Sequence, residues 1–437
     1  MSAHAIPARG RRVGAQSAPA PRPDAPAGAG ANPRVLFVDH TAVMGGGELS
    51  LMDIARRFRG TCRVLLLSDG PFRARLEEAG VAVEVLEAAD RVSRVTRGGG
   101  LFGDLKALPA ALRLARSVAE RGRGFDVFYA NSQKSMLIAA LAGLLARKPV
   151  VWHLRDILSG EHFSGAHRRI AAVAANLLTR RVIANSEATR RAFIESGGRG
   201  DKARVVHNGI DARPFGGACD EEIAGLRQRL GLGSAPAVGV FSRLAPWKGQ
   251  HVLLEALHAL PGVHGIVVGE ALFEGDKAYA EELLGAVRRL GLDGRVHFLG
   301  FREDIPHLLR MCHVVAHTSI APEPFGRVIV EGMLAGRPVV ATRAGGAVEI
   351  IQDRRTGRLV PPGDAAALAD AIRSTLGDAE AARSMAERGR RAALERFSLD
   401  AMLAGVERQV AEAMDRPVPR RSGPAAGRGD GQPRYGA

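Results

Sequence analysis

Short apolar runs, of the length that buried parallel strands have, recur along this chain and alternate with helical stretches. The first series consists of residues 35–38, 63–68, 81–86, 126–130, 149–153, 181–185 and 204–207, with helical patterns that include 104–120 and 133–146. A second series consists of residues 237–241, 264–268, 295–299, 313–317, 338–341 and 358–360. Alternation of strand and helix predicts an α/β fold, so we expect two doubly wound, Rossmann-like domains.

The point at which the pattern restarts sets the expected domain boundaries. We expect an N-terminal domain at residues 34–212, a C-terminal domain at 213–398 and a final helix at 399–415, and 437 residues suit such a two-domain chain. Residues 1–33 and 416–437 are rich in Pro, Gly, Ala and Arg and almost lack bulky apolar side chains, which predicts disordered basic tails.

The positive charge is concentrated at the two ends of the chain. The formal net charge is +15, and residues 1–34 and 416–437 each carry five Arg and one Asp. No aromatic platform or recognition motif accompanies these arginines, so we do not expect nucleic-acid binding. Plain solvation is the first interpretation of the charge, and peripheral contact with an anionic membrane is the alternative.

The cysteines and the longest apolar run indicate a cytoplasmic protein. Cys62, Cys219 and Cys312 are far apart and form no C-x-x-C pair, which favours a reducing compartment. The apolar run at 136–146 is too short to span a bilayer, which needs about 20 residues. Arg11 and Arg12 are not followed by the apolar stretch that an export signal requires. We therefore expect a cytoplasmic location, with the inner face of the membrane as an alternative site.

The segment 321–342 contains two carboxylates, Glu323 and Glu331, with seven residues between them. On one continuous helix they would lie about 12 Å apart along the axis, which is too far to hold one small group. Pro322 and Pro324 instead predict that Glu323 lies in a loop and that a helix begins near residue 328. The free N–H groups at the start of that helix favour a phosphate, and the carboxylates suit sugar hydroxyls. The segment therefore indicates a nucleotide-sugar site.

This spacing resembles the E-x7-E signature of the retaining glycosyltransferases of family 4, which have the two-domain GT-B fold. Four further segments resemble motifs of that family and occur in its order, so the resemblance spans residues 34–415. These segments are the glycine loop 45–48, the histidine segment 152–156, the interdomain marker 206–211, and the paired basic motif at 241–244 with 248–249. The resemblance implies two domains that face a central cleft, with the last helix crossing back onto the first domain.

The resemblance also implies roles for individual residues. Arg243 and Lys248 would neutralise the leaving diphosphate, so that no metal or other cofactor is expected. Glu323 would accept hydrogen bonds from the donor sugar, and His153 would contact that sugar near the reacting centre. Glu331 would bind the ribose. The remaining donor-binding residues implied are Gly45, Gly46, Gly47, Phe301, Arg302, Phe325, Gly326, Arg327 and Val328.

Several nearby residues have plainer interpretations. The three glycines could form a simple tight turn, and they are not a P-loop because no Lys-Ser or Lys-Thr follows. His313 directly follows Cys312 and His317 lies four residues further on, but the two histidines would lie about 13 Å apart along a strand, so we do not expect them to share a metal. Glu48 is expected in the first turn of a helix, and Asp276 is expected in a polar loop with no specific role.

Together these observations predict a retaining glycosyltransferase. It would move a sugar from a UDP- or GDP-sugar to a saccharide, a lipid-linked glycan or a small-molecule acceptor, without a metal, and form an α-glycosidic bond. One alternative is a sugar-nucleotide epimerase of GT-B fold. The other is an inactive nucleotide-sugar-binding protein, although all five of the residues Glu323, Glu331, Arg243, Lys248 and His153 are present.

Overall fold

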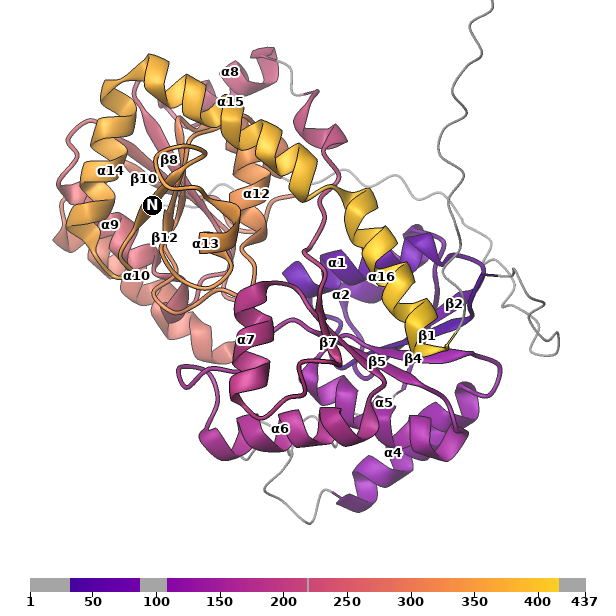
Figure 1. Cartoon of the computed structure of the whole chain (residues 1–437). Coiled ribbons are helices and arrows are strands. Elements are labelled where there is room, and N and C mark those ends of the chain that lie inside the picture. Colours follow the sequence, from indigo (N-terminus) through magenta and orange to yellow (C-terminus); the bar gives the residue numbers. More distant parts are fainter. Residues whose placement is uncertain (1–31, 87–107, 218–219, 416–437) are drawn as a thin grey trace, which may run out of the picture.

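The computed structural model describes residues 32–86, 108–217 and 220–415, which form two α/β domains (Figure 1). Each domain has its own parallel sheet, so the predicted fold class is confirmed. The two predicted tails, apart from residues 32 and 33, lie outside the described residues, as do Cys219 and the start of the helix expected at 104–120.

The first domain is built on seven parallel strands in the order β3-β2-β1-β4-β5-β6-β7. The strands are β1 (Val35–Asp39), β2 (Cys62–Leu66), β3 (Ala82–Val85), β4 (Val127–Ala130), β5 (Val150–Leu154), β6 (Arg181–Ala184) and β7 (Ala203–Val205). Val35 pairs with Cys62 on one side and with Val127 on the other, which places β1 near the centre of the sheet. The expected strands therefore exist, with ends within two residues of the expected positions.

Helices cover both faces of the first sheet. They are α1 (Gly46–Arg57), α2 (Pro71–Glu78), α4 (Leu108–Arg121), α5 (Gln133–Ala146), α6 (Gly165–Leu178) and α7 (Glu187–Glu195). Successive side chains of a strand point to opposite faces, so Phe128 of β4 packs with the α4, α5 and α6 layer. The next residue, Tyr129, packs on the other face with Leu51 of α1 and Leu76 of α2.

Helix α5 shows how the local sequence sets these elements. Ser132 caps the helix by accepting a hydrogen bond from the Ser135 N–H at 3.2 Å, and the Ser135 hydroxyl accepts one from the Ser132 N–H at 3.0 Å. Near the other end, a Cβ atom added to Gly143 would lie 2.4 Å from the Val150 side chain. Glycine therefore lets α5 pack directly against β5.

The second domain has six parallel strands in the order β10-β9-β8-β11-β12-β13. The strands are β8 (Ala237–Phe241), β9 (His264–Val268), β10 (Val296–Phe298), β11 (Val314–His317), β12 (Val339–Thr342) and β13 (Arg358–Val360). The helices are α8 (Asp220–Arg229), α9 (Gln250–His258), α10 (Lys277–Arg289), α11 (Ile305–Met311), α12 (Arg327–Leu334), α13 (Ala347–Ile350), α14 (Ala365–Gly377) and α15 (Ala379–Arg396), with 3-10 turns at Arg213–Phe215, Pro246–Lys248 and Glu274–Asp276.

The chain passes from the first domain to the second at the interdomain marker 206–211 and returns at residues 397–398. These two passages lie side by side. The Ile210 N–H donates to the Phe397 carbonyl oxygen at 3.0 Å. A Cβ atom added to Gly209 would lie 2.5 Å from the Ser398 carbonyl oxygen, so only glycine fits there without a shift.

The last helix, α16 (Leu399–Ala413), crosses back onto the first domain, as the resemblance implied (Figure 1). Its buried residues Met402, Val406 and Val410 belong to the same apolar cluster as Phe37 of β1 and Leu51 of α1. The first domain is therefore completed by residues from the far end of the chain. Within the described ranges, no helix is both long enough and apolar enough to cross a bilayer.

Candidate functional site

A cavity of about 550 Å³ lies between the two domains. It is lined by the loops that follow the parallel strands, which is where open α/β sheets bind ligands. All but one of the predicted site residues line it: Gly45, Gly46, Gly47, Arg243, Lys248, Phe301, Arg302, Glu323, Phe325, Gly326, Arg327, Val328 and Glu331. The exception is His153.

Lys248 and Glu323 form an ion pair on the second-domain side of the cavity. The Lys248 ammonium nitrogen lies 2.5 Å from Glu323 Oε2, and both side chains are largely buried, at 13% and 15% exposure. The Ser319 hydroxyl donates to the same carboxylate oxygen at 3.1 Å, and His317 Nε2 lies 3.4 Å from it. Glu323 is therefore held by three side chains from two segments of the domain.

The charges around Glu323 determine its protonation. Burial alone would raise the pKa of this carboxyl, but Lys248 and His317 outweigh burial and hold the pKa well below its usual range. Glu323 is therefore a carboxylate at neutral pH, and it can only accept hydrogen bonds.

Backbone geometry fixes the positions of both partners. Gly249 has φ +67° and ends the 3-10 turn that carries Lys248, while the Thr318 hydroxyl donates to the Lys248 carbonyl oxygen at 2.8 Å. On the other side, the Gly346 N–H donates to the Glu323 carbonyl oxygen at 2.8 Å. Gly345 and Gly346 lie against this segment so closely that Cβ atoms there would meet its backbone at 2.1 and 2.6 Å.

Helix α12 begins at Arg327, one residue after Gly326, which has φ +95°. Glu323 lies outside the helix, as the two flanking prolines predicted. The first N–H groups of a helix have no partner within it, so they offer donors, and the helix dipole adds positive potential. This end of α12 is consistent with the predicted phosphate site.

Glu331 and Arg327 face the same cavity from successive turns of α12. Arg327 Nε lies 3.5 Å from Glu331 Oε1, and the side chains are 16% and 17% exposed. Burial raises the pKa of Glu331, and the charge of Arg327 partly opposes this. The glycine loop approaches from the first domain: a Cβ atom on Gly46 would lie 3.2 Å from Arg327 Cδ.

Arg243 follows β8 and has a partner that the sequence did not reveal. Its Nη1 lies 2.9 Å from Asp276 Oδ2, and its guanidinium lies over the rings of Phe273 and Trp247, with centroid distances of 4.9 and 5.6 Å. The expectation that Asp276 has no specific role is wrong, because Asp276 positions this cation.

The predicted base-binding pair, Phe301 and Arg302, lines the cavity from the second domain. Phe301 is 55% exposed, and Arg302 forms two hydrogen bonds with Asp304, at 2.8 and 2.6 Å. The Arg302 side chain is thus engaged by Asp304, whereas the Phe301 ring is open to solvent, and contact of 301–302 with a base stays a prediction.

His153 does not line the cavity. It is fully buried at the end of β5, and its Nδ1 lies 2.5 Å from the Tyr129 hydroxyl. Alternation along the strand places it on the same face as Val151, next to β4. Burial and the charge of Arg155 lower the pKa of His153 well below its usual value, so the ring is neutral. Contact between His153 and a sugar stays a prediction, and it requires this side chain to move.

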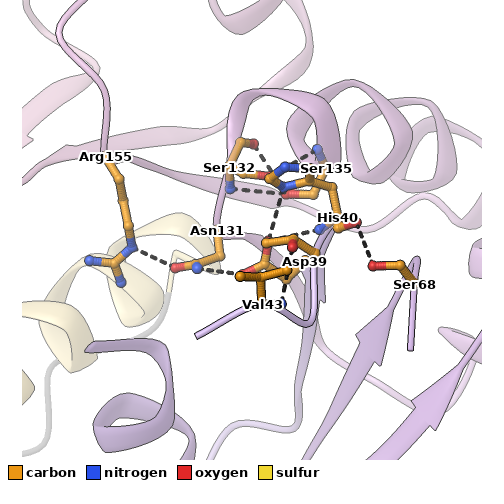
Figure 2. Close-up of polar contacts among 9 residues, drawn as sticks. Asp39, His40, Val43, Ser68, Asn131, Ser132, Ser135 and Arg155 are labelled. Carbon is orange, nitrogen blue, oxygen red and sulfur yellow. Dashed lines mark hydrogen bonds and ion pairs between the residues drawn. The ribbon is translucent and has the colours of Figure 1, made fainter. Parts of the chain in front are cut away.

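A network of polar side chains connects the first-domain strands to the cavity (Figure 2). Arg155 Nε donates to Asn131 Oδ1 at 2.6 Å, and Asn131 Nδ2 donates to Asp39 Oδ2 at 2.6 Å. Arg155 Nη1 also donates to Asn208 Oδ1 at 3.1 Å. Arg155 therefore links the ends of β1 and β4 to the interdomain passage, and it reaches the cavity wall.

Glu48 lies in the first turn of α1, as expected, and also lines the cavity. Burial and the neighbouring charge of Asp39 raise the pKa of Glu48 to about 8, although Arg155 acts in the opposite direction. A carboxyl with this pKa is mostly protonated at neutral pH, so Glu48 can donate as well as accept hydrogen bonds.

His317 and Ser319 are site residues that the sequence reasoning missed. From the sequence, His317 was considered only as a possible metal ligand with His313. In the fold, His317 ends β11, at the sheet edge where the other motifs lie. His313 instead accepts a hydrogen bond from the Ala237 N–H at 3.1 Å. Across the part of the chain that the structure describes, no group of three or more His, Cys, Asp or Glu side chains could hold a metal ion.

Comparison with known proteins assigns both domains to glycosyltransferase families. Residues 44–213 match the model of Glycosyltransferase Family 4, and residues 226–392 match the model of Glycosyl transferases group 1. The crystal structure of HepE from Anabaena in complex with UDP and glucose is 42% identical in sequence, with a TM-score of 0.79. That likeness covers 88% of this chain and 100% of the HepE chain.

Two curated relatives match over shorter regions. The lipopolysaccharide core biosynthesis glycosyltransferase LpsE of Rhizobium meliloti is 34% identical over 168 residues, which are 38% of this chain and 47% of LpsE. The GDP-mannose-dependent alpha-(1-6)-phosphatidylinositol monomannoside mannosyltransferase of Mycolicibacterium smegmatis is 34% identical over 221 residues, 48% of this chain and 57% of that enzyme. The chain thus spans about half the length of these relatives. Because family models match both domains and HepE is covered over its whole length, the chain belongs to the group 1 glycosyltransferases of GT-B fold.

Proposed function

We propose that this protein transfers a sugar from a nucleotide-sugar to an acceptor that binds on the first-domain side of the cavity. The observation that carries the proposal is the Lys248–Glu323 pair beside the start of α12, inside a cavity between two domains. A cation and free helix N–H groups suit a diphosphate, and a fixed carboxylate suits sugar hydroxyls. The HepE complexes with UDP and glucose and with UDP-glucose favour a UDP-sugar over a GDP-sugar as donor.

The reaction we propose retains the configuration of the sugar and gives an α-glycosidic bond. The bond between the anomeric carbon and the diphosphate oxygen breaks with its electron pair left on the diphosphate, a bond to the acceptor oxygen forms, and the proton of the acceptor hydroxyl passes to the departing diphosphate. Lys248 and Arg243 would stabilise the negative charge that grows on the leaving diphosphate. Such electrostatic stabilisation of the transition state is usually the largest contribution to the rate acceleration in sites of this kind. Glu331 would hold the ribose, and Glu323 the donor sugar, as the family resemblance implies.

Release of free nucleotide tests this proposal directly. UDP-glucose, UDP-N-acetylglucosamine and GDP-mannose are each incubated with the protein, with and without a lipid extract, and free UDP or GDP is measured. We expect nucleotide release from a UDP-sugar that depends on Lys248, with Arg289→Ala, an exposed change on α10, as control. Interconversion of the sugar without transfer would indicate the epimerase alternative, and binding without either reaction would indicate an inactive binding protein.

The anomeric configuration of the product tests the stereochemistry separately. Proton NMR of the first product from an α-linked donor should show an α-glycoside. A β-glycoside would contradict retention and leave the transferase assignment intact.

We also infer that the protein, which we place in the cytoplasm from its cysteine usage, contacts an anionic membrane. Ile170, Val173 and Leu177 form an exposed apolar stripe on α6, with exposed fractions of 40%, 51% and 75%. A second cavity, of about 510 Å³, lies at the end of α5 and is lined by Leu144, Arg147, Lys148 and Arg180 among others. Apolar side chains next to cations fit a surface of anionic lipid.

Sedimentation with vesicles tests this inference. We expect the protein to bind phosphatidylcholine vesicles that contain phosphatidylglycerol, and to bind pure phosphatidylcholine much less. The double change Val173→Ser with Leu177→Ser should remove binding, while Leu394→Ser, a change at an exposed leucine on α15, should not. Equal binding of all variants, or none to either vesicle, would refute the membrane contact.

A further inference from the structure

Glu349, on the short helix α13 of the second domain, binds the N-terminus of α7 in the first domain. Its two carboxylate oxygens accept hydrogen bonds from the backbone N–H groups of Glu187 and Ala188, at 2.8 and 2.7 Å. The first N–H groups of a helix lack partners within it, and a negative charge there is favoured by the helix dipole. Ser186 already accepts the next one, from the Thr189 N–H at 3.0 Å. The second domain thus supplies acceptors for two N–H groups that the cap of α7 itself, Ser186, does not satisfy.

The same carboxylate also reaches the passage between the domains. His207 Nε2 lies 3.1 Å from Glu349 Oε2, and the side chain of Glu349 is only 16% exposed. Burial alone would raise the pKa of Glu349, but the bonds from His207 and from the two backbone N–H groups lower it. The charged carboxylate of Glu349 therefore bonds the first domain and the passage, and such charge-assisted bonds are about twice as strong as neutral ones.

These contacts lead to the candidate donor site. The His207 ring packs near Phe325 and Phe397, with centroid distances of 6.2 and 5.5 Å, and Phe325 directly precedes Gly326 at the start of α12. At the start of α13, the N–H of Gly346 donates to the Glu323 carbonyl oxygen, and there is no room for a Cβ atom on Gly346 beside Phe325. Segment 323–326 is therefore enclosed between the start of α13, the helix that carries Glu349, and His207, which Glu349 contacts.

We propose that Glu349 is a positioning residue that couples the docking of the first domain to the conformation of segment 323–326. The inference rests on the proposed function, because that segment is the proposed donor site. Contacts that hold both sides of the segment are complete only when α7 and the passage are in place. The docking of the two domains and the geometry of Glu323 and the α12 N-terminus then change together, in a single conformational equilibrium. By linkage, a ligand that orders segment 323–326 must also strengthen the Glu349 contact with α7.

Amide hydrogen exchange of the whole chain, without ligand, tests the coupling. In Glu349→Ala the amides of Glu187 and Ala188 should exchange about tenfold or more faster, as expected for loss of hydrogen bonds to a charged group. The coupling predicts faster exchange in segment 323–326 as well. Loss confined to the start of α7 would show that Glu349 is only a helix cap and would overturn the proposal. If Glu349→Ala does not fold, Glu349→Gln, which keeps one acceptor oxygen, permits the same comparison.

Exchange in the presence of UDP gives a second, independent test. UDP should slow exchange at Glu187 and Ala188 in the wild type, and this response should disappear in Glu349→Ala. The control Glu395→Ala, an exposed carboxylate on α15, should keep it. UDP binding that leaves α7 unchanged in the wild type would refute the coupling. If UDP does not bind at all, the proposed function fails, and the comparison without ligand still decides the role of Glu349.

Discussion

The ammonium group of Lys248 lies 2.5 Å from Oε2 of Glu323, and this contact joins a turn after β8 to the loop before α12. The two residues are 75 positions apart in the sequence, so only the folded domain creates the pair. A cation for phosphate and an acceptor for sugar hydroxyls are thereby placed side by side. The first two predictions separate the contributions of the groups in this cavity.

Replacement of Lys248 by alanine should slow transfer by about 100-fold or more, with a smaller change in the KM for the donor. Its charge acts on the negative charge that grows as the diphosphate leaves, so its main effect is on the transition state. Steady-state kinetics with the donor identified by nucleotide release measure both constants, and circular dichroism confirms that the variant is folded. A rate equal to that of Arg289→Ala would contradict the role of Lys248.

Replacement of Glu331 by alanine should raise the KM for the donor by about tenfold and change kcat much less, because a ribose contact is made equally in the ground state and the transition state. Tenfold corresponds to about 1.4 kcal/mol of binding free energy. Calorimetric titration with UDP should show the same loss of affinity. Glu282→Ala, an exposed change on α10, is the control, and unchanged UDP affinity would show that Glu331 does not contact the nucleotide.

The raised pKa of Glu48 predicts a pH dependence of stability. The folded protein keeps this proton up to about pH 8, while the unfolded chain releases it near the ordinary value of 4.5. Between these values the native state binds more protons, so the free energy of unfolding falls as the pH rises. Glu48→Gln removes this dependence. The Tm of Glu48→Gln should therefore rise relative to that of the wild type as the pH increases from about 5 to about 8. Parallel curves of Tm against pH for the two proteins would contradict the raised pKa.

Chelation of metal ions should leave transfer unchanged. Arg243, Lys248 and the N-terminus of α12 together supply positive charge where a diphosphate would lie, which is the role that a divalent ion has in other phosphoryl and glycosyl transfer sites. Nucleotide release is measured after dialysis against EDTA and after addition of Mn²⁺ or Mg²⁺. Activity that disappears with EDTA and returns with Mn²⁺ would overturn the assignment of these charges.

Truncation should distinguish α16 from the residues that follow it. A chain that ends at Asp415 should melt within a few degrees of the full chain, because the apolar contacts of α16 are kept. A chain that ends at Ser398 loses Met402, Val406 and Val410 from the first-domain core and should not fold cooperatively. Differential scanning calorimetry measures the Tm of both truncated chains. A large fall in Tm for the chain that ends at Asp415 would show that residues 416–437 contribute to the fold.

The elements and the order of the site motifs could be predicted from the sequence because the relevant information is local. A buried parallel strand needs an apolar run, and two prolines beside Glu323 prevent a helix there. Residue-level environment could not be predicted in the same way. The Arg243–Asp276 pair spans 33 positions, and the contact of Glu349 with α7 spans about 160. Such pairs depend on how strands and domains meet, for which a single sequence carries no periodic pattern.

His153 shows the same limit on a smaller scale. Its place at the end of a strand was predicted, and β5 ends one residue later, at Leu154. The direction of its ring, however, depends on register with β4, which brings the Tyr129 hydroxyl next to it. The family resemblance identifies His153 as a candidate site residue, but the contacts of His153 are determined by the fold.

The position of α16 has a consequence for how the protein is made. Residues 399–413 are synthesised after the whole second domain, yet they complete the core of the domain that is synthesised first. While the second domain is being synthesised, the apolar face formed by Phe37, Leu51 and their neighbours lacks the cover that α16 supplies. The first domain therefore reaches its native state only after synthesis of the second. A chain whose synthesis stops before α16 exposes an apolar surface that chaperones and proteases can recognise.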